Sequence, residues 1–109
     1  MRIYLSGAVS DDPDFLAKFA KWENYLLKKY PDARVFNPAE HCHQMIEKKI
    51  IIVGDDKFKL WQDCMFHVLP QIEFCSHIFF IKWEYYQIES IGRTIEAMWA
   101  KKKGLEALR

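Results

Sequence analysis

The apolar run from Ser76 to Trp83 restricts the fold of this chain more than any other feature. Its centre lacks the alternating polar positions that mark a strand with one solvated face. A strand buried on both faces is typical of a parallel sheet, because the connections between parallel strands place helices on both sides. We therefore expect a sheet that is covered by helices above and below.

The first third of the chain predicts a β-α-β unit. Arg2 to Ser6 has the β-branched and aromatic residues of a short strand, and it runs directly into Gly7. Asp11-Asp12-Pro13 then predicts a helix start, and apolar residues follow at helical spacing as far as Lys29. Ala33 to Phe36 resumes as a strand, which Asn37-Pro38 ends.

The rest of the chain continues the alternation after one poorly patterned segment, Ala39 to Lys59. Leu60 to Glu73 regains helical spacing, with a kink or an end expected near Pro70. A last helix is predicted over Ser90 to Lys103, with Ser90 as its N-cap and Gly104 as the residue after its C-cap.

Alternating strands and helices predict an α/β fold, namely a three-layer α-β-α Rossmann-like (flavodoxin-like) domain with a short parallel sheet. With 109 residues we expect one domain over residues 1–109. Ligands of such sheets bind beyond the carboxyl ends of the strands. This rule selects three loops, residues 6–12, 37–43 and 82–93.

The near-equal numbers of basic and acidic residues argue against partners that are attracted by a strong overall electrostatic field. Sixteen basic and fifteen acidic residues leave a formal net charge of +1, so we expect no nucleic-acid polymer and no membrane as partner. The apolar runs are too short to span a bilayer and no signal peptide is evident, which predicts a cytoplasmic protein. Cys42, Cys64 and Cys75 fit neither a disulfide framework nor a metal knuckle and are interpreted as free thiols.

Two groups of residues in the selected loops suggest a binding site. Ser6-Gly7 ends the first strand, where a hydroxyl and exposed backbone N–H groups suit an anion or a sugar, although a plain glycine turn explains it equally well. In Ser90-x-Gly92-x-x-x-Glu96 the helix start offers N–H groups to an anion, and Glu96 lies on an overlapping helix face. An ordinary capped helix is the alternative.

Taken together, several motifs resemble the nucleoside 2-deoxyribosyltransferase family and the related deoxynucleotide N-hydrolases. The resemblance covers nearly the whole chain in order and spacing, through Met1 to Gly7, Asn37-Pro38-Ala39-Glu40, Trp61 with Met65, and Ser90-x-Gly92 with Glu96.

The resemblance implies that Glu96 is a nucleophile that attacks the anomeric carbon of a deoxyribose and releases the base. It implies that Ser90 and Gly92 receive a 5′-phosphate and that Ser6 and Gly7, with Tyr4 beneath them, line the sugar site. We add Asn37 from the second motif to the predicted substrate-binding residues. The partner implied is a nucleoside or nucleotide, with no cofactor and no metal, in a homo-oligomer.

The chain departs from the family pattern at four positions. Family aspartates at the opening of the buried strand and eight residues earlier correspond here to Ser76 and Val68. Arg93 replaces a small residue and either clamps a phosphate or fills the pocket, and Ala8 replaces a proline. A departing base needs a general acid, for which the chain offers the substitutes His67, His77 and Tyr4.

These departures leave two further hypotheses open. One is a catalytically silent relative that binds a nucleotide without cleaving it. The other is a structural or oligomeric protein, in which aromatic residues, 16% of the chain, serve subunit contacts. Trp83, Tyr85 and Tyr86 would stack on a base, form such a contact or cover the sheet edge. For His41-x-His43 we expect no metal, because the segment lacks a second ligand cluster.

Overall fold

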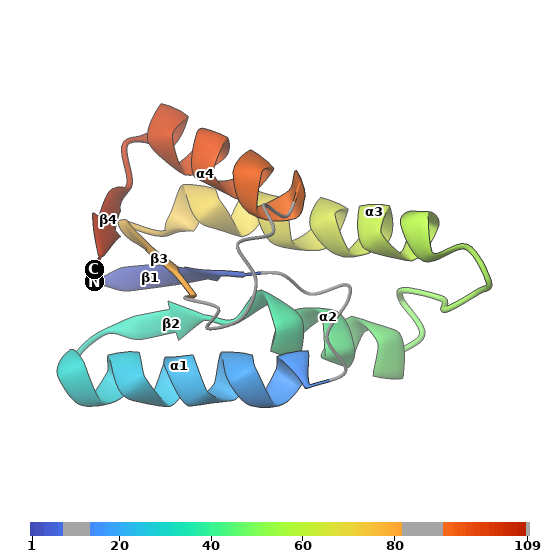
Figure 1. The fold of residues 1–109 in the computed structure, drawn as a ribbon, viewed down its shortest axis with the longest axis horizontal. Coiled ribbons are helices and arrows are strands. Elements are labelled where there is room, and N and C mark those ends of the chain that lie inside the picture. Colours follow the sequence, from blue (N-terminus) through green and yellow to red (C-terminus); the bar gives the residue numbers. More distant parts are fainter. Residues whose placement is uncertain (8–13, 82–90, 109) are drawn as a thin grey trace.

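Four parallel strands form one sheet in the order β2-β1-β3-β4 (Figure 1). The structure is a computed structural model and describes residues 1–7, 14–81 and 91–108. The strands are β1 (Arg2–Ser6), β2 (Arg34–Phe36), β3 (His77–Phe80) and β4 (Glu106–Leu108). The predicted α/β class with a short parallel sheet is therefore confirmed, and the strand order is compatible with a Rossmann-like or flavodoxin-like domain.

Helices flank both faces of the sheet (Figure 1). One face is covered by α1 (Phe15–Lys29), and the other by α4 (Ile91–Lys103) and the 3-10 helix η1 (Leu69–Phe74). The helix α3 (Lys57–Val68) leads into η1, while α2 (Pro38–Glu47) follows β2 and packs against α1 and α3. All the helices predicted from spacing are present, and α2 is additional.

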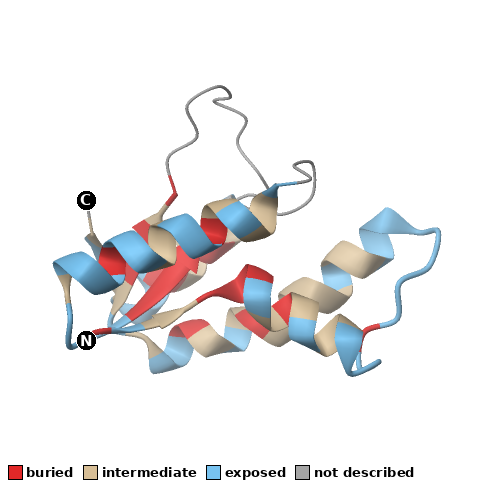
Figure 2. Cartoon of the chain, turned by 90° about the horizontal axis from the view of Figure 1, so that it is seen from below, coloured by how far each residue is buried: buried red, intermediate tan, exposed pale blue. Residues whose placement is uncertain are grey.

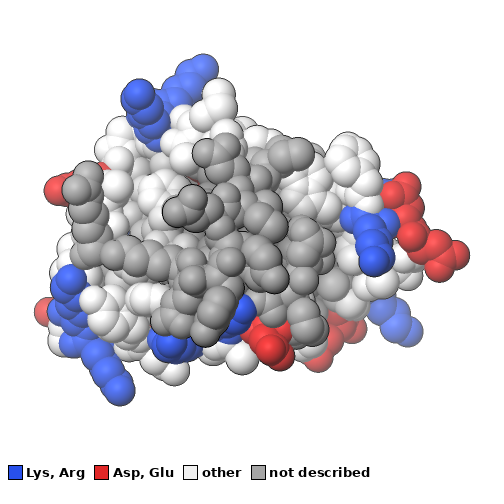
Figure 3. Space-filling view, in the orientation of Figure 1, with Lys and Arg blue, Asp and Glu red and all other residues white. Residues whose placement is uncertain are grey.

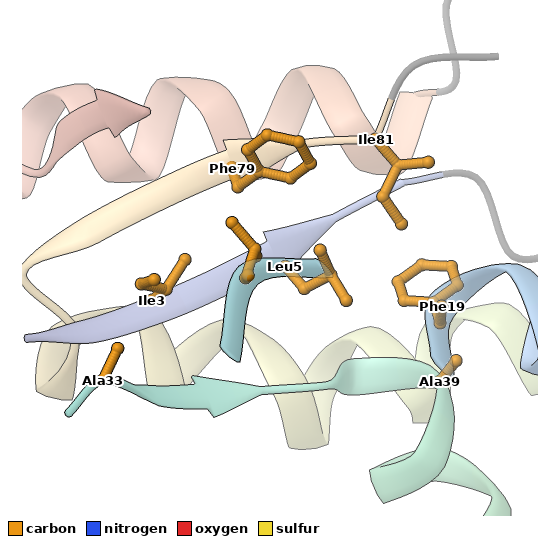
Figure 4. Close-up of a cluster of buried hydrophobic side chains, with 8 residues drawn as sticks. Ile3, Leu5, Phe19, Ala33, Ala39, Phe79 and Ile81 are labelled. Atoms are coloured by element: carbon orange, nitrogen blue, oxygen red, sulfur yellow. The ribbon is translucent and has the colours of Figure 1, made fainter. Parts of the chain in front are cut away.

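The central strand β1 supplies side chains to both cores. Ile3 and Leu5 lie in a cluster with residues of α1 and β3 (Figure 4), whereas Tyr4 belongs to a second cluster with η1 and α4. This division follows from the two-residue period of a strand, which sends alternate side chains to opposite faces. Figure 2 shows the resulting band of buried residues along the strands. In β3, Ile78 joins the second cluster and Phe79 the first, as expected for a strand covered on both faces.

The helix α2 occupies much of the segment whose pattern was poor. Asn37 caps it by accepting a hydrogen bond from the Glu40 backbone N–H at 3.1 Å, and Pro38 opens its first turn. Asn37-Pro38 therefore both ends a strand and begins a helix. At the other end Lys49 takes a left-handed φ of 59°, and the Ile50 N–H bonds to the Met45 carbonyl at 2.9 Å. This closure is the motif that glycine usually provides.

The helix α3 begins earlier than its apolar spacing indicated. The Asp56 carboxylate accepts hydrogen bonds from the backbone N–H groups of Phe58 at 3.0 Å and Lys59 at 3.1 Å, which fixes the start at Lys57. The α-helix ends at Val68, and Pro70 lies in the first turn of η1. The predicted change near Pro70 is thus a tightening from α-helix to 3-10 helix.

The strand β4 was not predicted and depends on the turn at Gly104. This residue has a φ of 77°, its N–H bonds to the Lys101 carbonyl at 3.2 Å, and the Leu105 N–H bonds to the Ala100 carbonyl at 2.9 Å. These two bonds close α4 in the way that favours glycine after a helix. The chain then reverses, and Glu106 pairs with the start of β3 through a 3.1 Å bond to the Ser76 carbonyl.

Gly7 directly follows β1, and the packing around it leaves no room for a side chain. A Cβ atom there would lie 3.0 Å from Ile81 Cδ1 and 3.2 Å from Phe19 Cζ, closer than ordinary van der Waals contact. Gly7 is buried, and the Ile81 N–H donates to the Ser6 carbonyl at 2.7 Å, which holds the ends of β1 and β3 together. Close packing of two strands and a helix therefore explains the glycine.

We expect Gly7→Ala to lower the free energy of unfolding by about 1–3 kcal/mol, the usual cost of adding a methyl group to a packed core. Urea denaturation of the purified protein measures this change. Gly54→Ala is the matched control, because a Cβ atom at Gly54 meets nothing within 4 Å. Equal stability of the two variants would contradict the packing role.

Candidate functional site

Three polar side chains from opposite ends of the sequence meet behind the carboxyl end of β1. Ser6 Oγ donates a hydrogen bond to Glu96 Oε1 at 3.0 Å, and both residues are buried, with exposed fractions of 0% and 3%. Tyr4 precedes Ser6 by two residues and so points to the same side of the sheet. Glu96 comes from the second turn of α4, which covers this side. We call this group the Tyr4–Ser6–Glu96 cluster.

A buried carboxylate is costly for a small domain. Removing a charged group from water destabilises the fold unless hydrogen bonds replace the lost solvation, and the Ser6 hydroxyl supplies one such bond to Glu96. An apolar residue at position 96 would avoid the cost altogether. Buried ionisable groups of this kind concentrate at sites where a protein uses them.

The Tyr4 hydroxyl is also buried and has no hydrogen-bond partner of ordinary geometry among the described residues. Its ring stacks on Phe36 with centroids 5.5 Å apart. Burial and then the negative charge of Glu96 raise the pKa of Tyr4 well above 10.0. The hydroxyl therefore keeps its proton at neutral pH and is available as a donor beside the Glu96 carboxylate.

The cluster lies where the fold favours ligand binding. The chain leaves β1 toward β2 on one side and later returns to β3 on the other, so the two connections diverge at the carboxyl ends of β1 and β3. Open α/β sheets bind ligands at this switch point. Ser6 is paired with Phe80 there, and the start of α4 faces the same edge (Figure 1).

The other predicted substrate-binding residues take different places. Gly7 directly follows β1 and packs against Ile81, and Asn37 caps α2 at the carboxyl end of the adjacent β2. Gly92 and Arg93 lie in the first turn of α4, and the Arg93 side chain is outside the described part of the structure. Ser90 also falls outside the described residues, together with Ala8 and the aromatic residues Trp83, Tyr85 and Tyr86.

Of the three substitutes considered as general acid, Tyr4 is the one that the structure brings to Glu96. His77 opens β3 at the amino edge of the sheet, where its Nε2 lies 3.3 Å from Glu106. His67 lies on α3, with its ring 5.6 Å from that of Phe66.

At the two positions where the family carries aspartates, this chain has a hydrogen-bonded serine, Ser76, and a buried valine, Val68. The Ser76 hydroxyl donates to the Arg2 carbonyl at 3.2 Å and accepts from the Arg2 N–H at 3.1 Å, at the amino end of β1. Ser6 lies at the opposite end of that strand. Val68 is buried with an exposed fraction of 2%. Neither position offers a polar group to the Tyr4–Ser6–Glu96 cluster.

The histidines of α2 have separate partners. The His41 ring packs against Phe36 with centroids 5.3 Å apart, and His43 Nε2 lies 2.9 Å from Glu47 Oε1. Burial, followed by the neighbouring His67 and Lys48, lowers the pKa of His41. Within residues 1–7, 14–81 and 91–108, no group of three or more His, Cys, Asp or Glu side chains is arranged to hold a metal ion.

From the sequence, Cys42 was interpreted as a free thiol, but its interaction with the cluster was not predicted. Cys42 is buried on α2, and the Glu96 charge is among the causes that raise its pKa, after a hydrogen bond with Cys64 and burial. The signal for it was Asn37-Pro38, because a helix starting there places Cys42 three residues after Ala39 on the buried face.

Charges of both signs lie around the periphery of the face shown in Figure 3. This distribution agrees with the formal net charge of +1. Among the described helices, none combines the length and the apolar character needed to cross a membrane.

No protein-family model, curated protein or solved structure matches this chain. The relationship to the deoxyribosyltransferases therefore stays a prediction from the sequence motifs.

The raised pKa of Tyr4 predicts a loss of stability at high pH. In the unfolded chain the tyrosine ionises near pH 10, whereas the folded protein keeps the proton to higher pH. The stabilisation is complete below pH 10 and falls above it, with a limiting slope of about 1.4 kcal/mol per pH unit.

Urea denaturation of wild type and Tyr4→Phe between about pH 9 and about pH 11, the range around the tyrosine pKa, measures this slope. Tyr4→Phe should lose stability less steeply, while Tyr25→Phe, which removes a hydroxyl from an exposed ring, should follow wild type. Parallel curves for all three proteins would show that ionisation of the Tyr4 hydroxyl does not cause the loss of stability at high pH.

Proposed function

We propose that this protein binds a deoxynucleoside or its 5′-monophosphate at the carboxyl end of β1 and cleaves or transfers its N-glycosidic bond through Glu96. The observation that carries the proposal is the buried Glu96 carboxylate, fixed by the 3.0 Å hydrogen bond from Ser6 at the switch point of the sheet. The motif resemblance independently favours a glutamate nucleophile at this position.

The chemistry assigned to Glu96 is a double displacement. One carboxylate oxygen attacks the anomeric carbon as the carbon–nitrogen bond breaks, so that the bonding electrons leave with the base and a glycosyl ester forms. Water or a second base then attacks the same carbon and releases Glu96. The water route is hydrolysis and the second-base route is transfer.

Ser6 and Tyr4 receive positioning roles in this proposal. The Ser6 hydroxyl holds Glu96 Oε1 in a fixed orientation, which lowers the entropic cost of reaching an attack geometry. Tyr4 stays protonated because its pKa is raised by burial and by Glu96. Its hydroxyl is thus suited to donate a hydrogen bond to the carboxylate or to a sugar oxygen, and is a weak acid toward the leaving base.

We expect Glu96→Gln to reduce base release from deoxynucleoside monophosphates by at least roughly 10³-fold, the scale seen when a group essential to covalent catalysis is removed. Chromatography of the released base measures the rate. Mass spectrometry of the quenched wild-type reaction should also find a deoxyribosyl adduct on the peptide that contains Glu96.

The matched control is Glu47→Gln, an exposed glutamate that pairs with His43 on α2; its rate should equal that of wild type. Equal rates for Glu96→Gln and wild type would remove Glu96 from the mechanism.

A second candidate, nucleotide binding without cleavage, is favoured by the residues at positions 68 and 76. Val68 is apolar and buried, and Ser76 is bonded to Arg2 at the far end of β1. A site with Glu96 but without the family carboxylates retains binding groups while it lacks groups that assist the departing base.

Thermal unfolding with a panel of deoxynucleoside monophosphates separates the two candidates. A ligand at 100 times its Kd raises the unfolding free energy by about 2.7 kcal/mol. Stabilisation with no released base indicates the silent binder, and stabilisation with base release indicates the enzyme. No stabilisation and no base release with any member of the panel would contradict both.

A further inference from the structure

Two cysteines that are distant in sequence lie side by side in the fold. Cys42 on α2 donates a hydrogen bond from its thiol to the Cys64 backbone carbonyl on α3, with a sulfur to oxygen distance of 3.8 Å. The residues are 22 positions apart, and the two helices pack directly against each other. The third cysteine, Cys75, lies at the junction of η1 and β3.

The two thiols differ in accessibility and acidity. Cys42 is buried with an exposed fraction of 6%, whereas Cys64 is partly exposed. A hydrogen bond from Cys42 lowers the pKa of Cys64, against opposing contributions from burial and Asp63. The hydrogen bond with Cys64 and burial raise the pKa of Cys42. The more accessible sulfur is therefore the one whose pKa is lowered, as in pairs with one attacking and one resolving cysteine.

We infer that Cys42 and Cys64 form a reversible redox pair, in which a hydroperoxide oxidises Cys64 and Cys42 then closes an intramolecular disulfide between α2 and α3. The inference rests on the contact between the two residues, the difference in their exposure and the packing of the helices that carry them. It does not depend on the proposed function.

The reaction balances with one peroxide. The Cys64 thiolate attacks one oxygen of hydrogen peroxide, the oxygen–oxygen bond breaks, and the departing hydroxide is protonated to water, which leaves a sulfenic acid on Cys64. The Cys42 sulfur attacks the sulfenic sulfur, its proton leaves with the hydroxyl group as a second water, and the disulfide forms. Two thiols are oxidised and one peroxide is reduced. A dithiol reductant reverses the step by exchange.

The disulfide would form beside the Tyr4–Ser6–Glu96 cluster. The charge of Glu96 contributes to the raised pKa of Cys42, and the Cys42 thiol contributes to that of Tyr4. Oxidation would replace a thiol donor at this place by a covalent link to α3. The modification thus changes a group that interacts electrostatically with Glu96 and Tyr4, and it fixes the position of α2 relative to α3.

The test treats the reduced full-length protein, carrying Cys75→Ser to remove the third thiol, with hydrogen peroxide. We expect the intact mass to fall by two hydrogen atoms and to return after addition of dithiothreitol. Trypsin should then yield the segment that contains Cys42 joined to the segment that contains Cys64. In the wild-type chain, trypsin leaves Cys64 and Cys75 on one peptide, and additional cleavage after Glu73 by a glutamate-specific protease separates them. This digest should give the same link between Cys42 and Cys64.

Two variants assign the roles of the sulfurs. Cys64→Ala should abolish the mass change, while Cys42→Ala should leave a sulfenic acid on Cys64 that dimedone traps. The Cys64 substitution lies at a partly exposed position, so it keeps the test valid if loss of the buried Cys42 thiol impairs folding.

Peroxide adducts on Cys64 without a link, a link to Cys75, or a link between two chains would overturn the inference. The oxidised protein should also melt several degrees higher than the reduced protein, because the cross-link restricts the unfolded chain. An oxidised form that melts at or below the temperature of the reduced form would contradict a disulfide that fits the native packing of α2 against α3.

Discussion

The parallel pairing of β1 with β3 organises the structure. Tyr4 is opposite Ile78 and Ser6 is opposite Phe80, while the Ile81 N–H closes the pair on the Ser6 carbonyl at 2.7 Å. This pairing places two strands from distant parts of the chain at the centre of the sheet. The two-residue period of β1 then separates the molecule into an apolar side under α1 and a side under α4 that carries both core and polar groups.

The parts of the fold that were predictable from sequence are those whose pattern is set by burial. The apolar centre of β3 and the spacing of apolar residues in α1 and α4 reflect the faces that these elements bury, so they remain visible without coordinates. By contrast, the buried residues of α2, namely Pro38, Ala39 and Cys42, are confined to its first half and show no repeated spacing, and its start depends on Asn37 as a cap. The Asn-Pro pair is equally compatible with a strand end, which is why the helix was missed.

The strand β4 was missed for a different reason. Its three residues are too few to show a period, and its position follows from the backbone reversal at Gly104 and from pairing with β3. The candidate site was only partly predictable. The resemblance implied one site for Tyr4, Ser6 and Glu96, but the hydrogen bond between Ser6 and Glu96 depends on the way α4 packs over the end of β1. Cys42 was interpreted as a free thiol, but its place near Glu96 was not predicted, because the helix that carries it was not expected.

The bond between Ser6 and Glu96 joins residues 90 positions apart. Contacts of such separation form late, since the entropy of closing the chain must be overcome before they contribute. The site therefore does not exist in a chain that has formed only its first β-α-β unit. Any activity that depends on Glu96 and Ser6 would report completion of the whole sheet, so recovery of activity during refolding would follow the slowest step of folding and not the collapse of the N-terminal half.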